Sequence, residues 1–217
     1  MKSILIIGMG NFGKYLAEKL QELKNNIMII DKNEKVIENL SVRFENAQIG
    51  DCNNPDVIKA LGVQDFDACI VALDEDFQAS LEITLNLKEA GAKYVISKAS
   101  RDIQAKFLLR NGADEVIYPE KDMAERLAYK ITGNTMYYFS LNDEYSVFEI
   151  ATPKDWEGET IMSLNIRKKY GLNVLAIKNN EEILPSPTAE YCFKENDHIV
   201  VLGKREDMIK VTSKKLK

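Results

Sequence analysis

Near its start the chain reads Ile4-Leu5-Ile6-Ile7-Gly8-Met9-Gly10-Asn11-Phe12-Gly13. An apolar run precedes the three glycines, and residues 15–23 carry apolar side chains at helical spacing. A strand, a GxGxxG loop and a helix in this order form the phosphate-binding turn of dinucleotide-binding folds. Gly8 permits the tight turn, Gly10 lets a pyrophosphate approach the backbone, and Gly13 lets the helix pack closely on the sheet. Because the helix N-terminus also presents free N–H groups, the segment predicts a nucleotide site.

An acidic residue stands where the ribose of such a nucleotide is expected. Asp31 ends the apolar run 27–30, close to the usual spacing of about 20 residues after the loop, where a carboxylate accepts from ribose hydroxyls. This carboxylate disfavours a 2′-phosphate, so NADP is not expected. Asp51 follows the next strand at the same edge of the sheet and either approaches the adenine or is an ordinary turn aspartate. The neighbouring residues Lys32 and Cys52 complete this part of the candidate site.

Strand and helix patterns alternate through the first half of the chain. Short apolar runs predict strands at 4–7, 27–30, 47–49, 68–73, 94–97 and 115–118. Helical spacing predicts helices at 15–23, 36–44, 55–61, 77–90, 103–110 and 123–131. Strands that are apolar on both faces are typical of parallel sheets covered by helices. We therefore predict an α/β fold, a Rossmann-like doubly wound parallel sheet, over residues 1–134.

The pattern changes in the remainder of the chain, residues 135–217. Strands are predicted closer together, at 137–141, 146–151, 173–178 and 198–202, with short helices near 160–170 and 206–210. We predict that Pro185-Ser186-Pro187 forms a turn between strands, because proline cannot donate to a strand ladder. This half is predicted to be a separate small α+β domain.

Composition excludes several classes of protein. The formal net charge of the 217 residues is −5, which argues against a nucleic-acid partner, because phosphate neutralisation needs a basic face. The three cysteines form no CxxC pair and indicate reduced thiols in the cytosol. The apolar run 4–7 is shorter than the roughly 7–15 residues of a signal-peptide core, and no stretch approaches the ~20 residues of a membrane span. A partner must hold the protein if it works at a membrane.

Catalytic chemistry has little support in these residues. The only histidine, His198, is interpreted as a solvated turn or strand-start residue. No HExxH motif or Cys/His cluster offers a metal site. The second domain, at roughly 80 residues, is small for a dehydrogenase substrate cleft. We therefore expect a nucleotide that acts as an effector by favouring one conformation. The alternatives are an NAD-dependent oxidoreductase and a stand-alone nucleotide sensor for another partner.

The whole chain resembles the RCK, or TrkA, family, with an RCK-N (TrkA-N) domain followed by an RCK-C (TrkA-C) domain. The matching segments are 7–13, Asp31, Pro119-Glu120-Lys121-Asp122-Met123, Asp143-Glu144-Tyr145-Ser146, Tyr170-Gly171 and Ala176-Ile177-Lys178. The resemblance implies a cytosolic regulatory subunit of a bacterial Ktr/Trk potassium-uptake system. Such subunits are homodimers that assemble into an octameric ring on a membrane-embedded potassium-translocating subunit. ATP or ADP, or NAD or NADH, changes the ring and gates transport without covalent chemistry.

The family's nucleotide-binding residues carry over onto matching positions of this chain. The loop Gly8–Gly13, with Met9, Asn11 and Phe12, would hold the phosphates and Asp31 the ribose. Lys98 matches a basic position near the phosphates, and Glu120 an acidic position where a divalent cation helps neutralise charge; the alternative is that both are solvated edge charges. Asn11 stands where the Ktr pattern commonly has arginine and cannot pair with a terminal phosphate. The choice among ATP, ADP and NAD therefore stays open.

A second effector site is implied in the RCK-C domain. The segments Ile161-Met162-x-x-Asn165-Ile166-Arg167 and Asn173-Val174 match the pattern that the family associates with cyclic di-AMP, bound between two such domains. Arg167 suits a phosphate and Asn173 an adenine edge, while Ile161, Ile166 and Val174 offer apolar contact to the bases. Met162 replaces the usual Ile or Leu, and Pro187 closes the site. The alternative is that the isoleucines are core residues and Arg167 is a surface charge.

Overall fold

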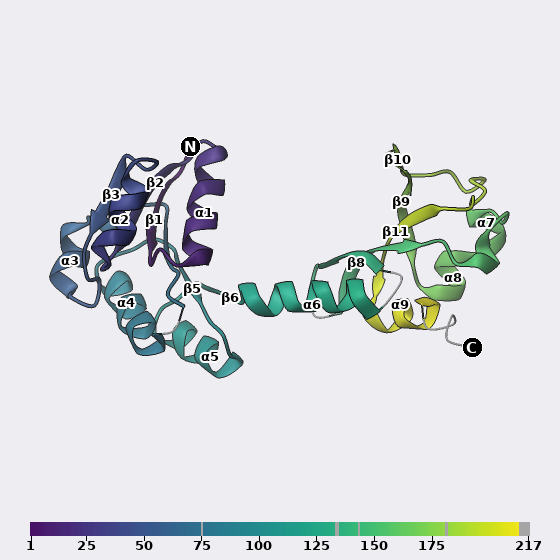
Figure 1. Ribbon diagram of the computed structural model, residues 1–217. Coiled ribbons are helices and arrows are strands. Elements are labelled where there is room, and N and C mark those ends of the chain that lie inside the picture. Colours follow the sequence, from purple (N-terminus) through teal and green to yellow (C-terminus); the bar gives the residue numbers. More distant parts are fainter. Residues whose placement is uncertain (75, 133–134, 143, 181, 213–217) are drawn as a thin grey trace. The chain divides into compact units, whose positions relative to one another are not determined.

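The computed structural model describes residues 1–212 except 75, 133–134, 143 and 181 (Figure 1). Packing divides the chain into two compact units, Met1–Lys121 and Asp122–Lys217. The division lies inside helix α6 (Pro119–Thr132), whereas the sequence placed the domain boundary after residue 134. The difference has a physical origin, because the Tyr129 ring of α6 packs 4.4 Å from the Tyr138 ring of the second unit. The apolar pattern of residues 123–131 predicts a helix, but it does not indicate which of the two sheets that helix packs on.

The first unit contains a six-stranded sheet in the order β3-β2-β1-β4-β5-β6, and every pair of neighbours is parallel. The strands are β1 Ser3–Ile7, β2 Asn26–Asp31, β3 Asn46–Ile49, β4 Ala68–Val71, β5 Val95–Lys98 and β6 Glu115–Ile117. The predicted Rossmann-like doubly wound sheet is confirmed. The strand order reverses between β1 and β4, and ligands of such sheets bind at this switch point, outside the carboxyl ends of the strands.

Helices cover both faces of this sheet. They are α1 Asn11–Glu22, α2 Glu34–Ser41, α3 Pro55–Ala60, α4 Phe77–Glu89 and α5 Asp102–Arg110, with a 3₁₀ turn η1 at Val63–Asp65. Leu5 and Ile7 of β1 join one buried cluster with α3 and α4, whereas Ile4 and Ile6 join another with α1 and α2. Burying one such side chain stabilises the fold by about 1.5–3 kcal/mol. The central strand is therefore apolar throughout because it supports two cores.

The second unit contains a five-stranded antiparallel sheet in the order β10-β9-β11-β8-β7. Its strands are β7 Thr135–Ser140, β8 Tyr145–Ala151, β9 Asn173–Asn179, β10 Glu182–Pro185 and β11 Asp197–Lys204. The other elements are a 3₁₀ turn η2 Lys154–Trp156, α7 Ile161–Leu164, α8 Ile166–Tyr170 and α9 Arg205–Thr212. Burial alternates along β8 and β11, as expected for a sheet with one face on a core. The predicted α+β character of this half is confirmed.

Two local predictions in the second unit are right only in part. The helix predicted near 160–170 is two short helices, because Asn165 between them takes a left-handed conformation with φ 46°. Pro185 is the last residue of an edge strand rather than part of a turn, and it pairs with Ala176. An edge strand tolerates proline, because the missing N–H belongs to the unpaired side. The turn begins at Ser186, whose N–H donates to the Leu175 carbonyl at 2.9 Å.

Candidate nucleotide site

A cavity of about 530 Å³ lies beside the glycine loop, at the carboxyl ends of β1, β2, β3 and β4. This volume is within the usual range of small-molecule sites. Six residues predicted from the sequence line it: Gly8, Gly10, Asp31, Lys32, Asp51 and Cys52. Sequence reasoning missed the other lining residues, among them Asn33, Asn53, Leu73, Asp74 and Asp76. Asp74 and Asp76 follow β4, which lies next to β1 where the strand order reverses. Ligands of such sheets bind at this reversal, so it is the signal that could have predicted both residues.

The glycine loop leaves no room for side chains at two points. A Cβ on Gly13 would lie 2.1 Å from the Gly8 carbonyl oxygen, so helix α1 approaches the loop as closely as glycine allows. A Cβ on Gly10 would lie 2.1 Å from Oδ2 of Asp74. Gly10 is also the N-cap of α1, with no side-chain cap, so the first N–H groups of the helix stay available to an anion.

The remaining loop residues contribute backbone rather than side chains. Met9 is buried in the core between α1, α2 and the sheet, and Phe12 packs against the same core. Asn11 is exposed at the first position of α1 and its side chain does not line the cavity. The predicted phosphate contacts of Asn11 and Phe12 therefore reduce to their N–H groups, whereas the Met9 N–H donates to the Asp31 carboxylate.

The Asp31 carboxylate joins the loop to the end of β2. Its Oδ2 accepts from the Met9 N–H at 2.7 Å, and its Oδ1 accepts from the Asn33 N–H at 2.8 Å. An ionised carboxylate has about four acceptor positions, so these two bonds leave capacity for the hydroxyls of a ribose. The position and chemistry of Asp31 thus fit the role predicted from its spacing.

Lys98 lies at the end of β5 with only 3% of its side chain exposed, so it is not a solvated edge charge. Its Nζ lies 2.6 Å from Oδ1 of Asp74 and 2.5 Å from Oε1 of Glu120. Burial lowers the pKa of Lys98, but the hydrogen bonds to Asp74 and Glu120 raise it more, so its pKa stands above the ordinary value. Neither Lys98 nor Glu120 lines the cavity; Lys98 contacts the lining residue Asp74, and Glu120 contacts Lys98.

The cavity wall at Cys52 contains a protonated thiol and a free acceptor. Burial, together with the negative charges of Asp51 and Asp31, raises the pKa of the Cys52 thiol to about 12, so it is no nucleophile at neutral pH. In the described part of the chain, Oδ1 of Asn53 is buried without a hydrogen-bond partner. Buried polar atoms of this kind call for a partner. A ligand in the cavity that donates a hydrogen bond would supply the partner that Oδ1 of Asn53 lacks.

The described residues contain no group of three or more His, Cys, Asp and Glu side chains arranged for a metal ion. His198 lies in β11 of the second unit, where its Nδ1 is 3.2 Å from Oε1 of Glu149. The same oxygen accepts from Lys178 Nζ at 3.1 Å. His198 thus lies at the start of a strand, as predicted, but it is half-buried beside a carboxylate partner rather than solvated.

The predicted cyclic di-AMP residues lie on α7, α8 and β9 and in the segment after β10. Met162, Asn165, Arg167 and Asn173 are exposed. Backbone hydrogen bonds tie the segment containing Pro187 to both sides, from Met162 N to Ala189 O and from Ser186 N to Leu175 O. Ile166 is a correction: it is 2% exposed in the core, so its side chain cannot contact a base. Ile161 and Val174 are half-buried against the same core.

Two family models match the chain. The model of the TrkA-N domain matches residues 4–119 and that of the TrkA-C domain matches residues 146–215. The chain belongs to the TrkA family. The resemblance inferred from the glycine loop and the later segments is thereby confirmed. The TrkA-N domain carries the cavity, and the TrkA-C domain carries the exposed residues on α7, α8 and β9.

Relatives support this assignment over nearly the whole length. The chain is 37% identical to Ktr system potassium uptake protein C and 33% identical to Ktr system potassium uptake protein A, both of Bacillus subtilis (strain 168). Each match covers 95% of this chain and 94% of the relative. The solved structure of the GsuK RCK domain has the same fold, with a TM-score of 0.67 and 19% identity over 95% of this chain and 46% of that chain. No helix among the described residues is long and apolar enough to cross a membrane.

Proposed function

We propose that the protein is a non-enzymatic regulatory subunit of a bacterial potassium-uptake system and that its TrkA-N domain senses an adenine nucleotide. The observation that carries the proposal is the cavity of about 530 Å³ between the glycine loop and Asp31. The 37% identity to a potassium uptake protein supports the transport role. The subunit is cytoplasmic, and a membrane-embedded potassium-translocating partner holds it at the inner face of the membrane.

The lining residues fit the parts of an adenine nucleotide. The phosphates lie at the N-terminus of α1 beside Gly10, and the ribose hydroxyls donate to Asp31. The adenine lies against Asp51 and the neutral Cys52, with its amino group donating to the free Oδ1 of Asn53. ATP, ADP, NAD and NADH share this adenosine portion. A divalent cation beside Glu120 would help neutralise the phosphates.

The ligand acts as an effector. The described lining side chains offer carboxylates, amides, one lysine and a thiol whose pKa is about 12, which suits binding better than hydride transfer. An effector shifts an equilibrium only through a difference in affinity between two conformations. The oxidoreductase alternative and the sensor for another partner both lack a specific supporting observation.

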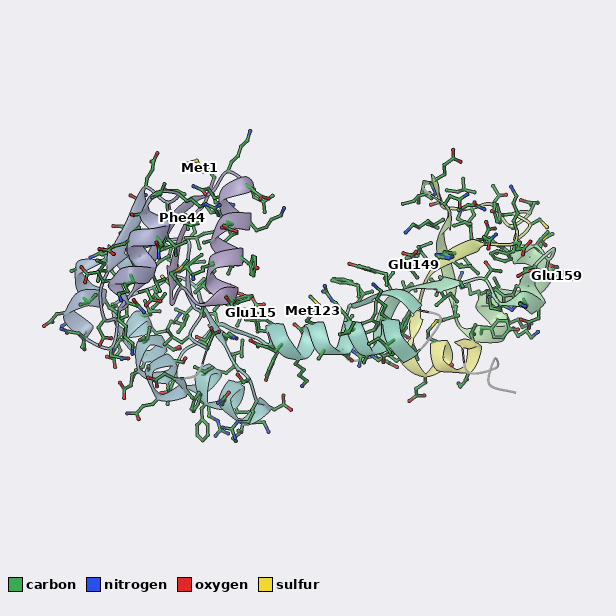
Figure 2. The ribbon with its side chains drawn as sticks, in the orientation of Figure 1. Met1, Phe44, Glu115, Met123, Glu149 and Glu159 are labelled. Atoms are coloured by element: carbon green, nitrogen blue, oxygen red, sulfur yellow. The ribbon has the colours of Figure 1, made fainter. Side chains whose placement is uncertain are left out.

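Assembly with a second copy is supported by the surface of α6. Met123, Leu127 and Ile131 repeat every four residues, which puts them on one face of the helix. They are 61%, 52% and 72% exposed, and Figure 2 shows Met123 on this helix. Exposed apolar faces of this kind mark interaction sites. We propose that the subunit is a homodimer and, by the family resemblance, that dimers form an octameric ring.

The second effector, cyclic di-AMP, is proposed at the TrkA-C domain. Arg167 and Asn173 are exposed and carry the groups that pair with a phosphate and an adenine edge. Met162 beside them is 64% exposed and offers apolar contact. Because these side chains are exposed in one chain, the ligand is expected between two such domains.

Two measurements test the proposed function. Mass spectrometry of the native purified protein identifies the retained ligand, and an adenine nucleotide is expected. Deletion of the protein in a host that depends on it is expected to reduce potassium uptake. Turnover of a nicotinamide cofactor with a small substrate would overturn the regulatory role, and unchanged potassium uptake would overturn the transport role.

A further inference from the structure

The carboxylate of Asp74 lies against the glycine loop, where the proposed nucleotide would place its phosphates. It follows β4 at the switch point of the sheet, and its Oδ2 lies 2.1 Å from where a Cβ on Gly10 would be. Gly10 is the N-cap of α1, so this oxygen lies at the N-terminus of the helix. The second oxygen, Oδ1, accepts from Lys98 Nζ at 2.6 Å. The carboxylate is thus paired with Lys98 on one side and lies against Gly10 on the other.

Both contacts stabilise an anion at this point. The partial positive charge of a helix N-terminus favours a carboxylate, and Lys98, with 3% of its side chain exposed, supplies a full positive charge. Asp74 itself keeps 43% of its side chain exposed. The loop is therefore already paired with an anion of the protein's own.

The rest of the cavity adds negative charge. Among the described lining residues, the charged side chains are Asp31, Asp51, Asp74, Asp76 and Lys32. Lys98, behind Asp74, is shared with Glu120. Asn11, at the start of α1, brings no charge to offset them. A ligand with a highly charged phosphate group meets more repulsion here than one with a lightly charged group.

We propose that Asp74 is a specificity-determining residue of this site: a phosphate must displace its carboxylate from Gly10, so the site favours nucleotides of low phosphate charge, such as NAD, over ATP. The inference rests on the proposed nucleotide-sensing function. Displacement breaks the contact between Asp74 and Lys98 and leaves the Lys98 ammonium able to donate to the incoming phosphate. Asp74→Asn keeps the shape of the side chain but removes its charge.

The test is calorimetric titration of the full chain with ATP, ADP and NAD, in EDTA to exclude divalent cations. Asp74→Asn is expected to strengthen ATP binding about tenfold and NAD binding less than about threefold, with ADP between them. Glu22→Gln is the control, because it removes one charge at the exposed far end of α1, on the order of 18 Å from Gly10. It is expected to leave all three affinities unchanged. Asp74→Ala repeats the test with a shorter neutral side chain.

The ratio of ATP to NAD affinity is the deciding readout, because general destabilisation would weaken both ligands together. An unchanged ratio in proteins that still bind nucleotides overturns the role of Asp74 and leaves the sensing function standing. Weaker ATP binding by Asp74→Asn when Mg²⁺ is added back also overturns it, because Asp74 would then be a cation ligand. If neither the native protein nor the variants bind any of the three nucleotides, the proposed sensing function is wrong, and so is the inference about Asp74 that rests on it.

Discussion

The two predicted ligand sites of this chain are built differently. In the TrkA-N domain, the ends of four parallel strands surround a cavity of about 530 Å³, and its lining side chains are held by hydrogen bonds and ion pairs. In the TrkA-C domain, the predicted ligand residues Arg167 and Asn173 are exposed on α8 and at the start of β9. The strands of the second sheet run antiparallel, so they do not bring one set of ends to a common edge.

This difference shows which feature of the fold forms each site. A parallel sheet with a switch point assembles a pocket from a single chain, because loops from neighbouring strands diverge there. An antiparallel sheet with one exposed face offers a surface, which becomes a pocket when a second surface covers it. The first site is expected to respond to substitutions of tightly packed backbone, and the second to substitutions of exposed charge.

The largest effect is expected at Gly13. Gly13→Ala puts a Cβ 2.1 Å from the Gly8 carbonyl, so the backbone must shift. Nucleotide binding is expected to be lost, and the free energy of unfolding in urea to fall by about 1–3 kcal/mol. Gly10→Ala is the matched variant, because its Cβ meets only the movable Asp74 carboxylate. It should weaken binding with a smaller loss of stability; equal losses of stability would contradict the packing argument.

Arg167→Ala tests the exposed site. Removal of a charge-assisted hydrogen bond is expected to weaken cyclic di-AMP binding about 10- to 100-fold, measured by calorimetry. Nucleotide binding in the TrkA-N domain should not change. Lys168→Ala, which removes an exposed charge from the next position of α8, is the control. Parallel weakening of both ligands would show that the two sites are not independent.

Substitutions of two adjacent asparagines in the first site are expected to affect different quantities, one the ligand affinity and the other the free energy of unfolding. Asn53→Ala removes the unpartnered Oδ1, so ADP affinity is expected to fall about fivefold while the stability of the nucleotide-free protein stays within about 0.5 kcal/mol. Asn54→Ala removes the cap of α3, whose Oδ1 accepts from the Asp56 N–H at 3.0 Å. That variant should lose about 1 kcal/mol of stability. Calorimetry and urea unfolding of both variants give the comparison, and the opposite pattern would refute the role of Asn53.

The smallest effect concerns alkaline pH in the TrkA-C domain. Burial and the hydrogen bond to Asp197 raise the pKa of Tyr191 from its ordinary value of 10 to about 12. A raised pKa favours the neutral phenol in the folded state, so its stabilisation is complete below pH 10 and is lost as the pH rises towards 12. Tyr191→Phe should flatten the dependence of the unfolding free energy on pH in this window. An unchanged slope would show that other groups control it.

Strand periodicity and the glycine loop were sufficient to predict the first sheet, because central strands buried on both faces leave an unmistakable apolar pattern. Strand β10 was missed because its residues are exposed and give no such pattern. Asp31 and Asp51 were predicted from their places after strands β2 and β3. Asp74 was missed, because its proximity to Gly10 depends on the order of strands in the sheet. That order is a property of the folded chain and not of any local segment.

The two hydrogen bonds that Asp31 accepts from Met9 and Asn33 have a consequence for the thermodynamics of binding. They fix the glycine loop and the carboxylate proposed to bind the ribose in one arrangement. Ordering a loop during association would reduce affinity, and a preorganised loop avoids that loss. The loop therefore loses its conformational entropy during folding, and little further loss of entropy is expected when the nucleotide binds.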